Sequence, residues 1–270
     1  MLRAVDFGES DRIVHLLTPA LGRLPAIAKG ARRSRRRFPG TLDLMNQLAV
    51  QVVRSRPAAL ARLEGARLLR TFEAIRKSPA RFALACYLLE LLDRLAPEGG
   101  APRDLTRLYA FAREALAWID REPPTQRMRV LLELRALDAL GLRPELGRCV
   151  RCGGALAAGE RGERAIPFLV AEGGPLCAAC APGAHGASLP IHLGTLRALE
   201  RALAFPLDRL GRLGLGGEAL LEAQRLAVRF LGFHVGIELQ SRRVLEELTL
   251  PGGEGKLPPP RQGQSGVSAR

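Results

Sequence analysis

The sequence predicts an α+β protein, in which a small N-terminal β-barrel precedes a helical domain that carries an inserted four-cysteine module. Three observations lead to this prediction. Short apolar segments separated by turns fill residues 1–72, apolar residues at helical spacing dominate residues 73–146, and two Cys-x-x-Cys pairs lie in the loop-rich residues 147–190.

The first 72 residues have the pattern of four or five short strands. Residues 13–18 are apolar and partly β-branched, Pro19 to Gly22 supplies a turn, and residues 24–29 resume an extended pattern, so a hairpin is expected. Two further strands are expected within residues 42–53 and 60–71. Because few helical signals interrupt this stretch, the strands are predicted to form a small barrel.

Helical periodicity begins after residue 72. Ser78 followed by Pro79 is a typical helix start, and apolar spacing continues to residue 95. A second helix is expected around residues 105–119, and a third is predicted over residues 125–140, where Gly141 ends it. Residues 73–146 are therefore expected to form a helical bundle.

The rest of the chain, residues 147–270, is divided into three parts. Residues 147–190 hold the cysteine module, and residues 191–250 are expected to pack on the bundle as helices, over residues 194–203 and as one long helix over residues 217–248. Residues 251–270 contain nine Gly or Pro and no aromatic residue, so this tail is expected to be disordered.

The charge of the chain favours a polyanionic partner. Lys and Arg number 41 against 27 Asp and Glu, which gives a formal net charge of +14, and nucleic acid or an anionic membrane surface would attract such a protein. No apolar stretch reaches the roughly 18 to 20 residues that cross a bilayer, and the N-terminus lacks the apolar core of a signal peptide. The sequence predicts a cytoplasmic protein with no membrane partner.

Residues 29–37 concentrate this charge. Six of the nine are basic: Lys29, Arg32, Arg33, Arg35, Arg36 and Arg37. Because the run lies between two predicted strands, the sheet would fix both ends of the loop and hold its charges against a phosphate backbone. The alternative is an ordinary solvated charge run. The loop suits an OB-fold, a five-stranded barrel whose loops and open face bind nucleic acid.

Aromatic residues are few in the predicted barrel. They are chiefly Phe7, Phe38 and Phe72, so base stacking can supply only part of any binding. Charge would carry most of it. Such a site is expected to accept both single- and double-stranded DNA of any sequence.

The paired cysteines predict one structural Zn²⁺ site. Cys149 with Cys152, and Cys177 with Cys180, would place four thiolates around the ion, which leaves no position for water or substrate. The alternative is a module of thiols without zinc. His185 and His192 lie near the second pair, but the four cysteines already complete the shell. The fifth cysteine, Cys86, is expected to be a buried, inert thiol.

Motifs for catalysis are missing from the sequence. It contains no phosphate-binding glycine loop, no His-Glu-x-x-His and no Gly-x-Ser-x-Gly. Glu9 and Asp11 flank Ser10 and could form the metal pair of a nuclease, but a turn in which they are solvated or paired with Arg12 is favoured. The sequence therefore argues against an enzyme, and no small-molecule substrate is expected.

Several short motifs follow one another along the chain. They are Gly8-Glu9-Ser10-Asp11-Arg12-Ile13-Val14, Leu17-Thr18, Gly22, Ala28-Lys29-Gly30-Ala31-Arg32-Arg33, Phe38, Gly40, Tyr87-Leu88-Leu89-Glu90-Leu91, Glu133-Leu134-Arg135-Ala136-Leu137, Leu140-Gly141-Leu142-Arg143-Pro144, the two cysteine pairs, and Gln240-Ser241-Arg242-Arg243. Over about residues 2–248 the chain resembles the RecO family of DNA repair proteins, in its zinc-containing branch.

The resemblance implies an OB-fold barrel, a helical domain, a zinc module and a function. RecO proteins are recombination mediators that bind single- and double-stranded DNA, anneal complementary strands, contact RecR and single-strand-binding protein, and help to load RecA. DNA binding is associated with the basic barrel surface, which residues 29–37 match. Contact with the acidic tail of single-strand-binding protein is associated with the helical region, where Arg127, Arg129 and Arg135 are the candidates; their alternative is a solvated helix face.

One departure concerns the N-terminus. Members of the family have several residues before the first strand, whereas this chain opens at Met1-Leu2-Arg3, so we expect a shortened first strand with an unpaired edge and a true start upstream. A zinc-ribbon RNA-binding or ribosome-associated protein is the alternative function. For the mediator, a cytoplasmic, nucleoid-associated location is expected.

Overall fold

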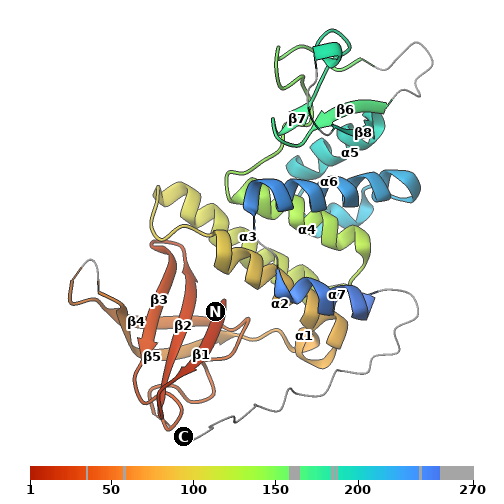
Figure 1. Cartoon of the computed structure of the whole chain (residues 1–270). Coiled ribbons are helices and arrows are strands. Elements are labelled where there is room, and N and C mark those ends of the chain that lie inside the picture. The colour runs from red at the N-terminus through yellow and green to blue at the C-terminus, as the bar shows by residue number, and fades with distance from the viewer. Residues whose placement is uncertain are drawn as a thin grey trace, which may run out of the picture.

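A computed structural model describes residues 1–34, 36–56, 59–157, 165–183, 186, 188–236 and 239–249. It confirms the predicted α+β class, with a sheet formed by the N-terminal residues and helices in the C-terminal part. Figure 1 shows the sheet at one end of the molecule, the helices in the middle, and the cysteine-bearing segment at the other end. The predicted tail, residues 251–270, lies outside the described residues.

Five strands form the N-terminal OB-fold sheet. They are β1 (Arg3–Phe7), β2 (Asp11–Thr18), β3 (Gly22–Ala28), β4 (Gln47–Val53) and β5 (Ala61–Arg70). The hydrogen-bonded order is β1-β2-β3-β5-β4, and all neighbours are antiparallel except β3 and β5. Alternate residues of each strand point inward, as the strictly alternating burial of β3 illustrates.

The fourth strand lies within the predicted segment 42–53 but is shorter than this segment. β4 begins at Gln47, because Met45 has a left-handed backbone with φ of 70° that interrupts the extended chain. The same segment meets the N-terminus: the Met1 amine donates to the Asn46 carbonyl at 2.8 Å, and the Met45 N–H donates to the Met1 carbonyl at 3.1 Å. Met1 thus bridges the two edges of the sheet at this end.

Four helices follow the barrel: α1 (Glu73–Lys77), α2 (Pro79–Leu95), α3 (Pro102–Arg121) and α4 (Gln126–Ala139). Local capping explains two of their starts, since the Ser78 hydroxyl accepts from the Arg81 N–H and the Thr125 hydroxyl accepts from the Met128 N–H. The predicted helix over residues 79–95 is confirmed. After α4, Gly141 has a φ of 76°, as a glycine past a helix end commonly does.

The predicted single helix over residues 217–248 is wrong. The chain instead forms α6 (Gly217–Val235) and α7 (Gln240–Thr249), and α6 ends at Gly236 in a left-handed conformation with φ of 61°. Helix α7 returns to α2, where the Glu90 carboxylate accepts from the Gln240 and Ser241 N–H groups and from the Ser241 hydroxyl. A side chain about 150 residues earlier therefore caps α7.

The remaining elements join the cysteine segment to the helices. They are β6 (Ala165–Leu169), β7 (Gly174–Pro175), the short 3-10 helix η1 (Ala181–Gly183), β8 (Ser188–His192), α5 (Leu193–Ala204) and the 3-10 helix η2 (Leu207–Arg212). The strands form a sheet of order β7-β6-β8, and Phe168 and Ile191 belong to the same hydrophobic core as α2 and α4. In the described parts of the chain, no helix has both the length and the apolarity that a membrane crossing requires.

Polar contacts fix the barrel against the helices. His15 Nδ1 lies 2.6 Å from Asp93 Oδ1, and Arg23 Nη1 lies 3.7 Å from the same oxygen, on a carboxylate whose side chain is only 7% exposed. The Arg23 N–H also donates to the Pro97 carbonyl at 2.8 Å. Gly22 permits this approach, because a Cβ there would lie 2.2 Å from the Pro97 oxygen.

Candidate nucleic-acid interface

The basic loop, defined as residues 29–37, is anchored at its start to the β1–β2 turn. Gly30 has a φ of 65°, and its N–H donates to Asp11 Oδ1 at 2.8 Å. The Arg32 N–H donates to the Ser10 carbonyl at 3.0 Å. These two contacts hold the first residues of the loop against the sheet.

The end of the loop is anchored to β5 and to the barrel core. The Arg37 carbonyl accepts from the Ala66 N–H at 3.1 Å, and Phe38 is buried among the inward-facing residues of the barrel. Arg37 also closes the loop on itself, since its Nη2 donates to the Lys29 carbonyl at 2.6 Å and its guanidinium lies 5.3 Å from the Phe38 ring centroid. The loop therefore has a defined path.

The basic side chains of the loop fall into two groups. Arg32 pairs with Asp6 at 3.5 Å, and Arg37 is engaged as described above. The side chains of Lys29, Arg33 and Arg36 are exposed and make no hydrogen bond or ion pair among the residues that the structure describes, although the charge of Lys29 helps to lower the pKa of Asp11. The sixth predicted residue, Arg35, lies outside the described residues.

The Asp11 carboxylate is part of the loop anchor. The hydrogen bond from the Gly30 N–H is the main reason that the pKa of Asp11 is lowered, and the Ser10 hydroxyl adds to it. Glu9 offers its carbonyl to Arg32 Nη1 at 3.2 Å. Arg12, expected to pair within this turn, instead pairs with Asp6 at 2.9 Å.

The three arginines predicted to bind a partner make contacts within the chain. Arg129 is buried and its Nε donates to Glu133 Oε1 at 3.0 Å. Arg127 and Arg135 are half-buried and donate to the backbone carbonyls of Leu213 and Leu203, respectively. Arg129 Nη1 also lies 3.5 Å from Glu246 Oε1 of α7, so all three connect α4 to its surroundings, which the sequence did not indicate.

The four paired cysteines come together as predicted. Their sulfur atoms all lie within 4.8 Å of one another, and Cys152 Sγ is 3.6 Å from Cys177 Sγ. Tetrahedral Zn²⁺ with four thiolates at ~2.3 Å requires sulfur separations of about 3.8 Å. None of the four is in a disulfide. The donor set and its spacing fit a closed structural zinc site.

Backbone donors prepare one of these thiols for a metal. Burial opposes ionisation of Cys149, but N–H groups of Cys177, Cys152 and Arg151 outweigh it and lower the pKa of Cys149 to about 6. Gly153, with φ of 70°, lets its own N–H turn back to the Cys149 carbonyl at 2.9 Å. This tight turn directs the backbone donors toward the sulfur.

His192, one of the two histidines near the second cysteine pair, is not part of the four-cysteine cluster. His192 Nδ1 instead lies 2.6 Å from Glu222 Oε1, and His192 forms a separate group with Glu222 and Glu218. Glu222 also accepts from the His192 N–H and the Thr195 hydroxyl at the start of α5. His185 lies outside the described residues.

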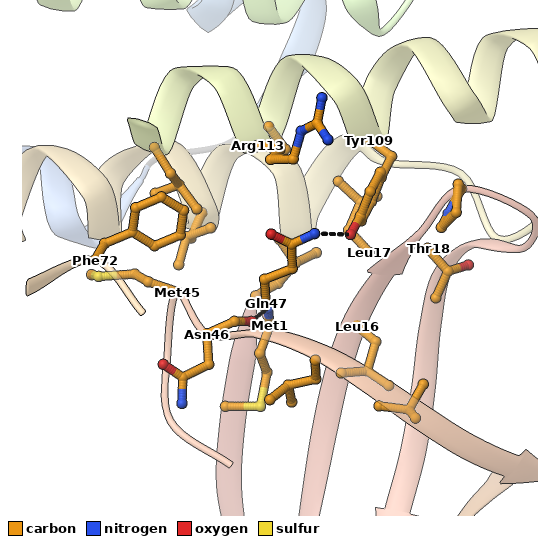
Figure 2. A pocket seen from close by; sticks show the side chains of 17 residues that line it. Met1, Leu16, Leu17, Thr18, Met45, Asn46, Gln47, Phe72, Tyr109 and Arg113 are labelled. Carbon is orange, nitrogen blue, oxygen red and sulfur yellow. Dashed lines mark hydrogen bonds between the residues drawn. The ribbon is translucent and has the colours of Figure 1, made fainter. Parts of the chain in front are cut away.

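A pocket that sequence reasoning missed lies between the barrel and α3. Its volume is about 170 Å³, and Leu16 and Phe72 are among its mostly apolar walls. Figure 2 shows Gln47 and Tyr109 joined across it by a hydrogen bond of 3.2 Å, with Arg113 on the helix side. Because its walls come from segments far apart in the chain, no local pattern could have indicated it.

Comparison with known proteins finds family models that match the N-terminal and C-terminal parts of the chain. The family model described as Recombination protein O N terminal matches residues 1–72, and the model described as Recombination protein O C terminal matches residues 76–243. Proteins named DNA repair protein RecO are similar over most of their length. One from Anaeromyxobacter sp. (strain K) is 39% identical over 248 residues, covering 92% of this chain and 94% of its own.

Two relatives from other bacteria have the same name and are also similar to this chain over most of their length. DNA repair protein RecO of Myxococcus xanthus (strain DK1622) is 34% identical over 243 residues, covering 89% of this chain and 92% of its own. DNA repair protein RecO of Syntrophus aciditrophicus (strain SB) is 32% identical over 250 residues, covering 92% of this chain and 93% of its own. With an OB-fold barrel, a helical domain and a four-cysteine cluster already in place, this chain belongs to the RecO family of DNA repair proteins.

Proposed function

We propose that this chain is a non-enzymatic recombination mediator that binds single- and double-stranded DNA through the basic loop, without reading sequence. One observation carries the proposal: the side chains of Lys29, Arg33 and Arg36 are exposed and make no hydrogen bond or ion pair with the described residues, on a loop anchored at both ends. Cations held in this way can contact successive phosphates. Arg35, within the same run, is proposed to contribute as well, together with Arg32 and Arg37 at the loop margins.

Strand annealing follows from this binding without a catalytic residue. A cationic surface that holds two strands lowers their mutual repulsion and raises the local concentration of complementary segments. The net charge of +14 supports the same role over a wider surface. We propose that annealing and help in loading the recombinase RecA both use DNA held at this surface.

The proposed protein partners are RecR and the acidic C-terminal tail of single-strand-binding protein. Arg127 and Arg135 are half-buried on α4 and keep part of their surface exposed, so they remain the proposed contacts for that tail, with Arg129 supporting the same helix. We propose that one Zn²⁺ bound by Cys149, Cys152, Cys177 and Cys180 has a structural role.

The test compares two double charge reversals in the full chain. Arg33→Glu/Arg36→Glu alters the basic loop, whereas Arg197→Glu/Arg243→Glu makes the same charge change at exposed positions of α5 and α7. Affinity for labelled single-stranded DNA is measured by fluorescence anisotropy at several salt concentrations. The loop variant should weaken binding and flatten the log–log salt slope by about 1.4, because two phosphate contacts are lost.

Annealing is measured with the same variants on complementary strands coated with single-strand-binding protein. The loop variant should lose annealing, and the α5/α7 variant should retain it. Equal affinity and annealing for the loop variant and the unaltered protein would contradict the proposal. Incubation of the protein with labelled DNA and Mg²⁺ or Mn²⁺ tests the non-enzymatic role, because cleavage of the DNA would contradict it.

A further inference from the structure

The outer face of β1, β2 and β3 carries an apolar row that leads to the basic loop. Val5 lies opposite Ile13, and Ile13 lies opposite Ile27, so the three form one row across the strands. Their inward neighbours fill the barrel core, and the row points outward. Val5 is 43% exposed, and Ile13 and Ile27 are partly exposed.

An aromatic side chain extends this row. Phe7 is two residues beyond Val5 on β1, so it lies on the same face, and it is 54% exposed. The other aromatic residues of the barrel, Phe38 and Phe72, are buried. Phe7 is therefore the one exposed aromatic side chain in the barrel, among the residues that the structure describes.

Cations flank the apolar face along both strand directions. Lys29 follows Ile27 by two residues, in the turn after β3 at the start of the basic loop, while Arg3 precedes Val5 by two residues on β1. Both are exposed. The acidic Asp11 lies opposite Phe7, and its carboxylate accepts from the Gly30 N–H. Helix α2 meets this side of the barrel where Asp93 contacts His15, and Arg3 lines a pocket with residues of α2 and α7. Val5 and Phe7 are exposed.

We infer that this face, defined as Val5, Phe7, Ile13 and Ile27 with Arg3 and Lys29 at its ends, binds the bases of single-stranded DNA, and that Phe7 stacks on one of them. Apolar and aromatic groups between cations suit a strand whose bases and phosphates alternate in the same way. Duplex DNA cannot use Phe7, because its base faces are stacked inside the helix. The inference rests on the proposed function and adds a preference for single strands.

The first test removes the ring. Phe7→Ala is compared with Phe233→Ala, which removes a ring that is 60% exposed on α6, remote from the barrel. Affinities for single-stranded and duplex DNA of equal length are measured at a salt concentration that suppresses phosphate contacts. Phe7→Ala should weaken single-strand binding about tenfold and leave duplex binding unchanged. Thermal melting, which should not change, confirms that the variant is folded.

The second test uses tryptophan fluorescence. The chain has one tryptophan, Trp118, which is 4% exposed, so Phe7→Trp introduces an exposed reporter. Single-stranded DNA should quench the fluorescence of Phe7→Trp by stacking and should leave that of Phe233→Trp unchanged. Duplex DNA should quench both variants less than single-stranded DNA quenches Phe7→Trp.

Three results would overturn the inference. They are unchanged single-strand affinity of Phe7→Ala, an equal loss of single-strand and duplex affinity, and a dimer of the unaltered protein that Phe7→Ala dissociates, which would assign the face to a second copy of the chain. The basic-loop variant separates this failure from that of the proposed function. If Arg33→Glu/Arg36→Glu loses DNA binding while Phe7→Ala does not, the DNA-binding function stands and base stacking falls.

Discussion

The Asp11 carboxylate receives the backbone N–H of Gly30 at 2.8 Å, so the first residue of β2 holds the loop that follows β3. Gly30 can present its N–H in this direction because its φ is 65°. A negative side chain thus lies beside a loop proposed to bind a polyanion. Asp11 is expected to favour DNA binding by holding the loop in place and to oppose it by its negative charge.

Asp11→Ala separates these two effects. Removal of a negative charge should by itself tighten DNA binding, whereas loss of the anchor should weaken it; we expect several-fold weaker binding, because the basic loop loses its fixed geometry. Asp11→Asn, which keeps an acceptor oxygen, should bind more tightly than Asp11→Ala. Anisotropy titrations at one salt concentration measure the DNA affinities of the unaltered protein, Asp11→Asn and Asp11→Ala. Tighter binding by Asp11→Ala than by the unaltered protein would show that charge dominates.

The same contact predicts a pH dependence. The pKa of Asp11 is lowered in the folded protein, so its anchoring contribution is fully present above the unfolded value of about 3.9 and is lost as the pH falls through the folded pKa. Amide hydrogen exchange of Gly30 should show this as faster loop opening at acid pH, after correction for intrinsic rates. Asp11→Ala should show no such change.

Gly22→Ala should be strongly destabilising. The added Cβ would lie 2.2 Å from the Pro97 carbonyl oxygen, and Gly22 also has a left-handed φ of 66°, so we expect a loss of about 2–4 kcal/mol in the free energy of unfolding. Gly40→Ala is the control, because Gly40 has a φ of 62° and open space around its Cβ position. It should lose only about 1–2 kcal/mol of left-handed strain.

Urea denaturation of both variants measures this difference. Equal losses for Gly22→Ala and Gly40→Ala would show that the barrel moves away from Pro97 at little cost. A larger loss for Gly22→Ala would locate the close approach of the barrel and the helices at this residue.

Cys152→Ser should abolish stoichiometric zinc binding, because three thiolates and a hydroxyl do not complete the closed shell. Metal content by mass spectrometry and hydrogen exchange of residues 149–180 should both change, while single-strand affinity at the barrel should not. Cys86→Ser is the matched control: burial first, and then Glu90, raise the pKa of this thiol to about 11, and it is not part of the four-cysteine cluster. Retention of one zinc ion by Cys152→Ser would contradict the assignment.

Glu133 is expected to be essential for the stability of the helical bundle. Its carboxylate accepts from the Tyr87 hydroxyl at 2.6 Å and from Arg129 Nε at 3.0 Å, and the side chain is 2% exposed. Glu133→Ala would leave the Arg129 charge buried without this partner, at a cost of about 3–5 kcal/mol. Glu246→Ala removes the other, more exposed partner of Arg129 and should cost less than about 1 kcal/mol. Chemical denaturation gives both values, and similar losses would contradict this account.

Helix α7 should detach from α2 when Glu90 can no longer accept hydrogen bonds. Burial opposes ionisation of Glu90, but donors from Ser241 and Gln240 outweigh it and lower its pKa. The contact therefore stabilises α7 above the unfolded value of about 4.3 and is lost as the pH falls through the folded pKa. Glu90→Ala should increase hydrogen exchange in residues 240–249 at neutral pH, and Glu247→Ala should not.

Local signals predicted the elements that local contacts define. Residues 79–95 were predicted correctly because Ser78 and Pro79 specify the start of α2 within a few residues. The break after Gly236 was missed because the position of α7 depends on Glu90, far away in the sequence. Arg129 was expected on an exposed helix face, since an arginine pattern does not reveal that Glu133 accompanies it into the core.

The candidate site was predictable in composition but not in arrangement. The six basic residues and the four cysteines can be identified by counting and spacing. Which cations stay free, and which ones Asp6 or the Lys29 carbonyl engages, depends on how the loop folds back on the sheet. The exposure of Phe7 likewise depends on where the strand ends, because the same residue type is buried at Phe38.

The closure of the basic loop by Arg37 has a consequence for the kinetics of DNA release. A loop whose path is set by its own hydrogen bonds loses little conformational entropy when a strand arrives. Its residence time on DNA can then be set by the number of phosphates engaged, and a strand can leave by losing these contacts one after another. Rapid turnover of this kind would suit the proposed mediator, which hands a strand on after pairing it.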